Sequence, residues 1–448
     1  MRRLAIGLIL ALALATPAAE AQRKISLIRD AEIEDTIRAF GAPLFAVAGL
    51  DAAAVQVHLI NDKTLNAFVA GGQRIFLHTG LLLATDDANQ VIGVLAHETG
   101  HISGGHLARG QEALREASTQ AILTMLLGAA AAVAGGGGAA AGVIAGGSQV
   151  TQRTLLQYSR TQEAAADQAA LTFLDQTGQS SLGLLQFLQK LGDQEALAAA
   201  NQDPYVRTHP LARQRIDTVR AHSERSPHAR ASDPPQFQRM HARMRAKLAG
   251  FLESPAQTLQ RYPLSDASEA ARYARAIARH KANDLTAALA EIDGLIAEHP
   301  RDPYYLEAKG QFLLEAGRVA DAVAPYQAAA QLRPDATLLL LALGQAQVST
   351  DDPGLLRAAI DNLEAAARRD PSDATVWRWL AQAYGRDGQE GPAALATAER
   401  YALVGQYRDC LLQANRALRL LRPGTPGALR AEDLKQFAET KLKTLKER

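Results

Sequence analysis

The first regular pattern in the chain is a set of short runs in which apolar and polar residues alternate. These runs lie between residues 55 and 77, interrupted by the turn-like Asn61-Asp62 and by Gly71-Gly72. Alternation of this kind is typical of half-buried strands, and a Gly-Gly pair supplies a tight turn. We therefore predict a small antiparallel sheet in this region.

The pattern then changes to a helical one. Apolar residues recur at helical spacing through Ile102, and either Asp86 or Asp87 can cap the start of that helix. Further helical patterns cover residues 155–173 and 182–191. The first half of the chain is thus predicted to be an α+β unit dominated by helix.

A longer periodicity begins near residue 268 and extends to about residue 371. Pro300 and Pro334 are 34 positions apart, and Pro371 follows after 37 more. Each proline closes a pair of alanine-rich helices, a pattern that resembles tetratricopeptide repeats. In the second unit Gly310 occupies the small position of the first helix, whereas Lys309 departs from the consensus leucine. We predict an α-solenoid of stacked helix pairs here.

The N-terminus and the composition bear on location. Residues 1–21 combine Arg2 and Arg3, an apolar stretch and a small-residue cleavage site, which predicts a secretory signal peptide over the alternative of an uncleaved anchor.

The 48 basic and 47 acidic residues nearly balance, so no nucleic-acid partner is indicated. Cys410 is the single cysteine, which excludes an intramolecular disulfide.

An unusual stretch lies between Glu116 and Arg153, where the sequence has no charged residue. Its middle, residues 128–147, is almost entirely alanine, glycine and valine. So many glycines weaken a helix, and alanine adds little transfer energy into a bilayer. We favour a mobile helical hairpin or lid beside an active site. The competing hypothesis is peripheral membrane contact through residues 121–150.

The strongest chemical motif is His97-Glu98-Thr99-Gly100-His101. Two histidines four residues apart share one face of a helix and can bind a single Zn²⁺ together. Glu98 then projects beside the metal, where a carboxylate can take a proton from an activated water and later pass it to a leaving amine. This pattern predicts a zinc-dependent hydrolase of peptide bonds.

A catalytic zinc needs a third protein ligand. The extended motif with a third histidine is absent, because position 107 is leucine, and His106 has the wrong spacing and is predicted to orient the helix end. Glu163 is the better candidate, since Asp167 lies four residues later on the same helical face. Asp167 could then accept the free ring N–H of a histidine ligand.

These motifs follow one another in an order that resembles a known group. The order is Gly71-Gly72, Thr79-Gly80-Leu81, His97 to His101, Ser159 to Asp167, and Thr208-His209-Pro210. It resembles the HtpX and BepA group of gluzincin peptidases, and the added repeats and signal peptide resemble the periplasmic BepA-like members. The resemblance covers almost the whole mature chain.

The resemblance implies roles for individual residues. Glu98 would be the catalytic base, and Asp167 is sometimes assigned as proton donor, although its chemistry alone favours a place behind a histidine ligand. A histidine at the position of His209 can approach the zinc, and Arg215 can help to stabilise the tetrahedral intermediate. His209 before a proline is equally consistent with a plain loop residue. Residues 66–70 resemble the edge strand along which a substrate peptide lies.

The resemblance also implies a function. A soluble periplasmic peptidase with one Zn²⁺ per chain would degrade misassembled outer-membrane proteins and dock through its repeats on the machinery that inserts β-barrels. Its activity would stay low until a partner binds if His209 and the glycine-rich hairpin block the cleft at rest. Two alternatives are a periplasmic chaperone or assembly adaptor with minor protease activity, and a membrane-associated protease.

The complete prediction is a mainly α protein with four segments. These are a signal peptide (1–21), a gluzincin-type α+β metallopeptidase domain with a small antiparallel sheet (22–225), a linker and connecting helix (226–265), and an α-solenoid of tetratricopeptide-like helix pairs (266–448).

Overall fold

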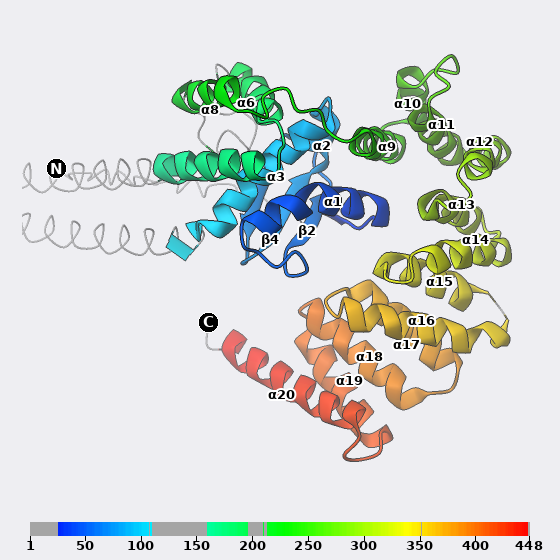
Figure 1. Ribbon diagram of the computed structural model, residues 1–448. Helices are drawn as coiled ribbons and strands as arrows, with labels where there is room; N and C mark the ends of the chain where they lie inside the picture. The colour runs from blue at the N-terminus through cyan, green and yellow to red at the C-terminus, as the bar shows by residue number, and fades with distance from the viewer. Residues whose placement is uncertain are drawn as a thin grey trace, which may run out of the picture.

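The computed structural model describes residues 26–106, 108–109, 159–195, 209, 213–350 and 352–446 (Figure 1). It is mainly helical, with one small sheet in the N-terminal half and paired helices in the C-terminal half. The predicted signal peptide and the glycine-rich hairpin lie outside the described residues.

The sheet is mixed, and the prediction of an antiparallel sheet was wrong in this respect. Its strands are β1 (Leu27–Ile28), β2 (Gln56–Ile60), β3 (Ala67–Ala70) and β4 (Arg74–His78), in the order β1-β2-β4-β3. β3 and β4 form the expected antiparallel hairpin, with Gly71 and Gly72 at φ values of 59° and 98°. β2, however, pairs with β4 in parallel.

The reason lies in the connection after β2. The carbonyl oxygen of Asp62 accepts hydrogen bonds from the Gly80 amide at 2.8 Å and from the Thr79 hydroxyl at 3.0 Å. Both donors follow directly after β4. The chain is therefore held across the end of β4 rather than turning back along β2, and β3 forms on the far side.

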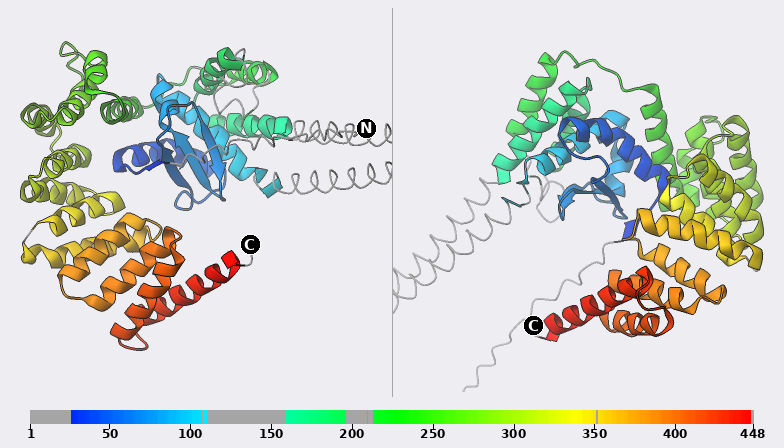
Figure 2. Two further views of the ribbon diagram at one scale, coloured as in Figure 1. Left: turned by 180° about the vertical axis from the view of Figure 1, so that it is seen from behind. Right: turned by 60° about the horizontal axis from the view of Figure 1, so that its bottom comes forward.

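Helices cover one face of the sheet (Figure 2). Strand residues that point to this face share one hydrophobic core with residues of α1, α3 and α9. Asp87 caps α3 by accepting from the Gln90 amide, as one of the two predicted caps. The helices of this half are α1 (Ala31–Val47), α2 (Thr79–Ala84), α3 (Ala88–Ser103), a helix over residues 159–176, α6 (Leu182–Glu195), α8 (Arg213–Arg225) and α9 (Pro235–Leu252).

The C-terminal half is a curved array of helices in which successive helices pack on one another. A Cβ atom at Gly310 would lie 2.8 Å from Cγ of Tyr326, which explains the small residue expected there. The array consists of α10 (Pro255–Arg261), α11 (Glu269–Lys281), α12 (Leu285–Glu298), α13 (Pro303–Glu315), α14 (Val319–Leu332), α15 (Thr337–Ser349), η2 (Pro353–Leu355), α16 (Leu356–Arg369), α17 (Ala374–Arg386), α18 (Glu390–Leu403), α19 (Tyr407–Leu420) and α20 (Pro426–Lys446).

The two halves are joined through α9 and a buried ionic cluster. Figures 1 and 2 show the array bending around α1, so that α20 runs back towards the N-terminal half. Lys247 of α9 is 1% exposed, and its ammonium lies 2.8 Å from Asp30 and 3.3 Å from Glu307 of α13. Because one buried cation contacts carboxylates from both halves, it fixes the first helix pairs of the array against α1.

Candidate metal centre

Helix α3 places the two motif histidines on one buried face. His97 and His101 are one turn apart, and their Nε2 atoms lie 3.1 Å from each other. His97 is completely buried and His101 is 9% exposed. The helical spacing predicted from the sequence thus brings both imidazoles to one point.

The helix over residues 159–176 brings Glu163 to the same point. It approaches α3 closely because Gly100 has no side chain: a Cβ there would lie 2.6 Å from the carbonyl oxygen of Ala166. At this short separation the Glu163 carboxylate reaches both histidines. Its Oε2 lies 3.3 Å from His97 Nε2, and its Oε1 lies 3.3 Å from His101 Nε2.

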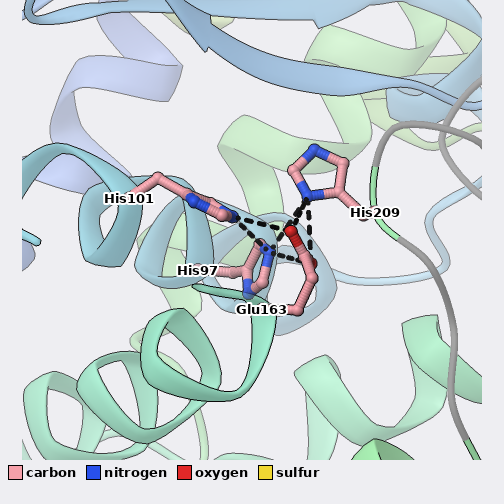
Figure 3. Close-up of side chains that lie close together, drawn as sticks. All are labelled: His97, His101, Glu163 and His209. Carbon is pink, nitrogen blue, oxygen red and sulfur yellow. Dashed lines mark hydrogen bonds and ion pairs between the residues drawn. The ribbon is translucent and has the colours of Figure 1, made fainter. Parts of the chain in front are cut away.

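His209 completes the cluster (Figure 3). Ligand atoms of His97, His101, Glu163 and His209 all lie within 4.8 Å of one another. His209 Nδ1 is 3.4 Å from His97 Nε2 and 3.1 Å from Glu163 Oε1. Three imidazole nitrogens and one carboxylate thus converge on one point, and together they offer a donor set that suits a divalent cation.

Glu98 lies beside the cluster and makes no hydrogen bond to the residues that the structure describes. It is fully buried, and neither carboxylate oxygen has a hydrogen-bond partner among the residues that the structure describes. Its Oε1 is 3.7 Å from His209 Nε2. A buried carboxylate without hydrogen bonds destabilises the folded state. Its presence therefore indicates that it binds a water molecule or acts on a group bound beside it.

Asp167 and Arg215 lie behind the four-residue cluster. Asp167 Oδ1 is 2.9 Å from His97 Nδ1, on the side of the ring that faces away from the cluster. Arg215 of α8 donates to both Asp167 oxygens, from Nε at 2.6 Å and from Nη2 at 2.8 Å. Its Nη1 lies 2.8 Å from Glu163 Oε2. The guanidinium therefore orients both carboxylates.

Residues 29–223 match the model of Peptidase family M48. The N-terminal half is an M48 peptidase domain. The chain is 28% identical over 395 residues to the "Beta-barrel assembly-enhancing protease" of Yersinia pestis, covering 86% of this chain and 79% of that protein. It is 30% identical over 158 residues to "Metalloprotease LoiP" of Escherichia coli (strain K12), covering 35% and 58%. The chain is thus a metalloendopeptidase.

A solved structure also resembles part of the chain. The alignment with the "Crystal structure of MamA" covers 39% of this chain and 97% of the MamA chain, at 18% identity and a TM-score of 0.29. No helix in the described ranges is both long and apolar enough to cross a bilayer.

The electrostatics of the M48 domain favour a cation in the cluster. Burial lowers the pKa of His97, but Asp167 and Glu163 outweigh this effect and raise it to about 9. Burial raises the pKa of Glu163, yet His209, His101 and His97 hold it well below its usual range. Burial raises the pKa of Asp167, but hydrogen bonds from Arg215 and His97 outweigh burial and lower it to about 2. Glu163 and Asp167 are therefore both ionised at neutral pH, and a metal ion can replace the proton at His97.

His106 lies against the ring of His101, whereas its spacing had suggested a role in orienting the helix end. Its Nδ1 lies 2.9 Å from His101 Nδ1, the nitrogen of that ring which faces away from the cluster. Burial lowers the pKa of His106 to about 4, so its ring is neutral. A neutral ring at this distance can form a hydrogen bond with His101 Nδ1 and thereby fix the tautomer of His101.

Proposed function

We propose that this chain is a zinc-dependent endopeptidase with one ion held by His97, His101 and Glu163. The observation that carries the proposal is the convergence of these three side chains on one point beside the buried Glu98 carboxylate, which makes no hydrogen bond to the described residues. A His₂Glu donor set with an adjacent glutamate is suited to a catalytic zinc. Such an ion supplies Lewis-acid activation of water and of the scissile carbonyl.

Glu98 is the residue that moves protons. A carboxylate in its position accepts a proton from the attacking water at one oxygen and delivers it to the departing amine. Its burial and its lack of other partners support this role, since no competing hydrogen bond holds the carboxylate in the described structure.

Asp167 and Arg215 are positioning residues in this proposal. Both Asp167 oxygens are engaged by Arg215, and Oδ1 also faces His97, which supports an orienting role over a proton donor. Arg215 points at two carboxylates in this conformation. Stabilisation of a tetrahedral intermediate by Arg215 would require it to release Glu163.

His209 defines a resting state. A catalytic zinc keeps one position open, whereas His209 Nδ1 lies among the ligand atoms and would close it. Its Nε2 is 3.2 Å from the Ala67 carbonyl oxygen on β3. We infer that His209 must withdraw before a substrate can enter, so basal activity is low.

We further propose that the enzyme acts in the periplasm on misassembled outer-membrane proteins. The signal-peptide pattern at residues 1–21 and the name of the Yersinia pestis relative support this assignment. The helical array, which has the curved form of protein-binding solenoids, would dock on the β-barrel assembly machinery. The alternative is a chaperone or adaptor with minor protease activity, but such a protein has no use for a buried carboxylate beside the metal ligands that makes no hydrogen bond.

Degradation of an unfolded β-barrel protein tests the proposal. The wild-type chain is compared with Glu98→Gln, and the zinc content of both is measured. We expect both to hold zinc and only the wild type to cut. Equal cutting by both proteins would remove Glu98 from the mechanism. If neither zinc-loaded protein cuts, and the His209→Ala variant does not cut either, the result would favour the hypothesis that the protein is a chaperone or adaptor.

A further inference from the structure

Three aromatic rings form a stack across the face of the sheet that points away from α3. His58 of β2 and Phe76 of β4 have ring centroids 4.9 Å apart at 20°, and Phe76 and Phe68 of β3 are 5.0 Å apart at 10°. The three residues are directly opposite one another in the sheet register, and each is half-buried. The stack ends at Phe68, on the edge strand.

The backbone of this edge strand can accept another strand. The His78 amide donates to the Asn66 carbonyl at 2.9 Å, so residues 66, 68 and 70 direct their backbone groups towards β4. Ala67 and Val69 consequently direct theirs away from the sheet. The Ala67 carbonyl is the group that His209 contacts, which puts the edge next to the metal centre.

A polypeptide paired with this edge would place one side chain against Phe68. Adjacent strands lie about 4.8 Å apart, and directly opposite residues project to the same face. In antiparallel pairing, a residue opposite Phe68 forms a non-hydrogen-bonded pair, whose side chains approach most closely. Its ring would then lie at the spacing already repeated between His58, Phe76 and Phe68.

We propose that Phe68, supported by Phe76 and His58, is a specificity subsite for an aromatic side chain of the substrate. The inference rests on the proposed peptidase site and names the class of segment that it prefers. Stacked rings attract each other beyond the area that they bury, so phenylalanine or tyrosine is favoured over leucine. Strands of transmembrane barrels carry aromatic girdles at both membrane interfaces, so they provide extended segments of this kind.

The test compares cleavage and binding in Phe68 variants. Products from an unfolded β-barrel protein are mapped by mass spectrometry for the wild type, Phe68→Leu and Phe68→Tyr. Binding of a barrel-strand peptide, and of the same peptide with its aromatic residues changed to leucine, is measured in the Glu98→Gln background. Arg74→Ala is the matched control, because Arg74 is exposed on the same sheet face outside the stack.

We expect one subsite to be enriched in phenylalanine and tyrosine. Phe68→Leu should abolish that enrichment and reduce the binding difference between the two peptides by about three- to tenfold, the contribution of one aromatic pair. Phe68→Tyr and Arg74→Ala should retain both. The inference is overturned if the wild type cuts without aromatic preference, or if Phe68→Leu keeps it. Aromatic-dependent binding without any cleavage would leave the subsite standing and would refute only the proposed activity.

Discussion

Replacing Gly100 by alanine tests how the metal centre is assembled. The added Cβ would lie 2.6 Å from the Ala166 carbonyl oxygen, whereas ordinary contact begins near 3.4 Å. The two helices must therefore separate by roughly 0.8 Å. Metal sites tolerate errors of about 0.2 Å in ligand distance, so Glu163 would be drawn away from His97 and His101. We expect a loss of about 10- to 100-fold in zinc affinity and about 100-fold in activity.

Zinc affinity is measured by competition with a chelator, and activity is measured as cleavage of an unfolded protein. Gly385→Ala in α17 is the matched control, because a Cβ there meets nothing within 4 Å. Alanine is the better helix former by about 1 kcal/mol, so the control should be at least as stable as the wild type. Unchanged zinc affinity in Gly100→Ala would refute the argument that close helix packing positions Glu163.

Three other predictions follow from the geometry. His209→Ala should raise basal peptidase activity several-fold at unchanged zinc content, measured without any partner protein, since it opens the fourth position. Lys247→Met should lower the free energy of unfolding by about 3–5 kcal/mol, measured in urea, because Asp30 and Glu307 would lose their buried partner. Burial and Arg245 lower the pKa of His241 to about 4. In the unfolded chain the His241 ring takes up a proton near pH 6.5. The free energy of unfolding should therefore fall by about 3 kcal/mol between pH 6.5 and 4 in the wild type, and by less in His241→Gln.

The elements could be predicted from the sequence, but the order of the strands could not. Alternation and glycine placement predicted the strands and the β3–β4 hairpin because both are local properties. The parallel pairing of β2 with β4 depends on hydrogen bonds between Asp62 and residues 79–80, which no periodic pattern encodes. Between α15 and α16 the regular repeat is interrupted by η2, where a proline and a glycine stand in the sequence.

Part of the site could likewise be predicted from the sequence, and part could not. Helical spacing was enough to bring His97 and His101 together, and the Glu163–Asp167 pair was recognisable once those histidines were known. That His209 joins them is a matter of tertiary structure, since 46 residues separate it from Glu163. The aromatic stack could not be predicted from the sequence, because His58, Phe68 and Phe76 are neighbours only through the sheet register. Period-two alternation places each of the three on the less buried face of its own strand, but it does not show that the three rings are neighbours.

The most direct test of the account is the metal content of purified chains, measured by elemental analysis after dialysis against buffer without added metal. We expect one zinc per chain in the wild type and in Glu98→Gln, and far less than one in His97→Ala, His101→Ala and Glu163→Ala. Full zinc content in Glu163→Ala, or none in the wild type after zinc is supplied, would contradict the proposed centre.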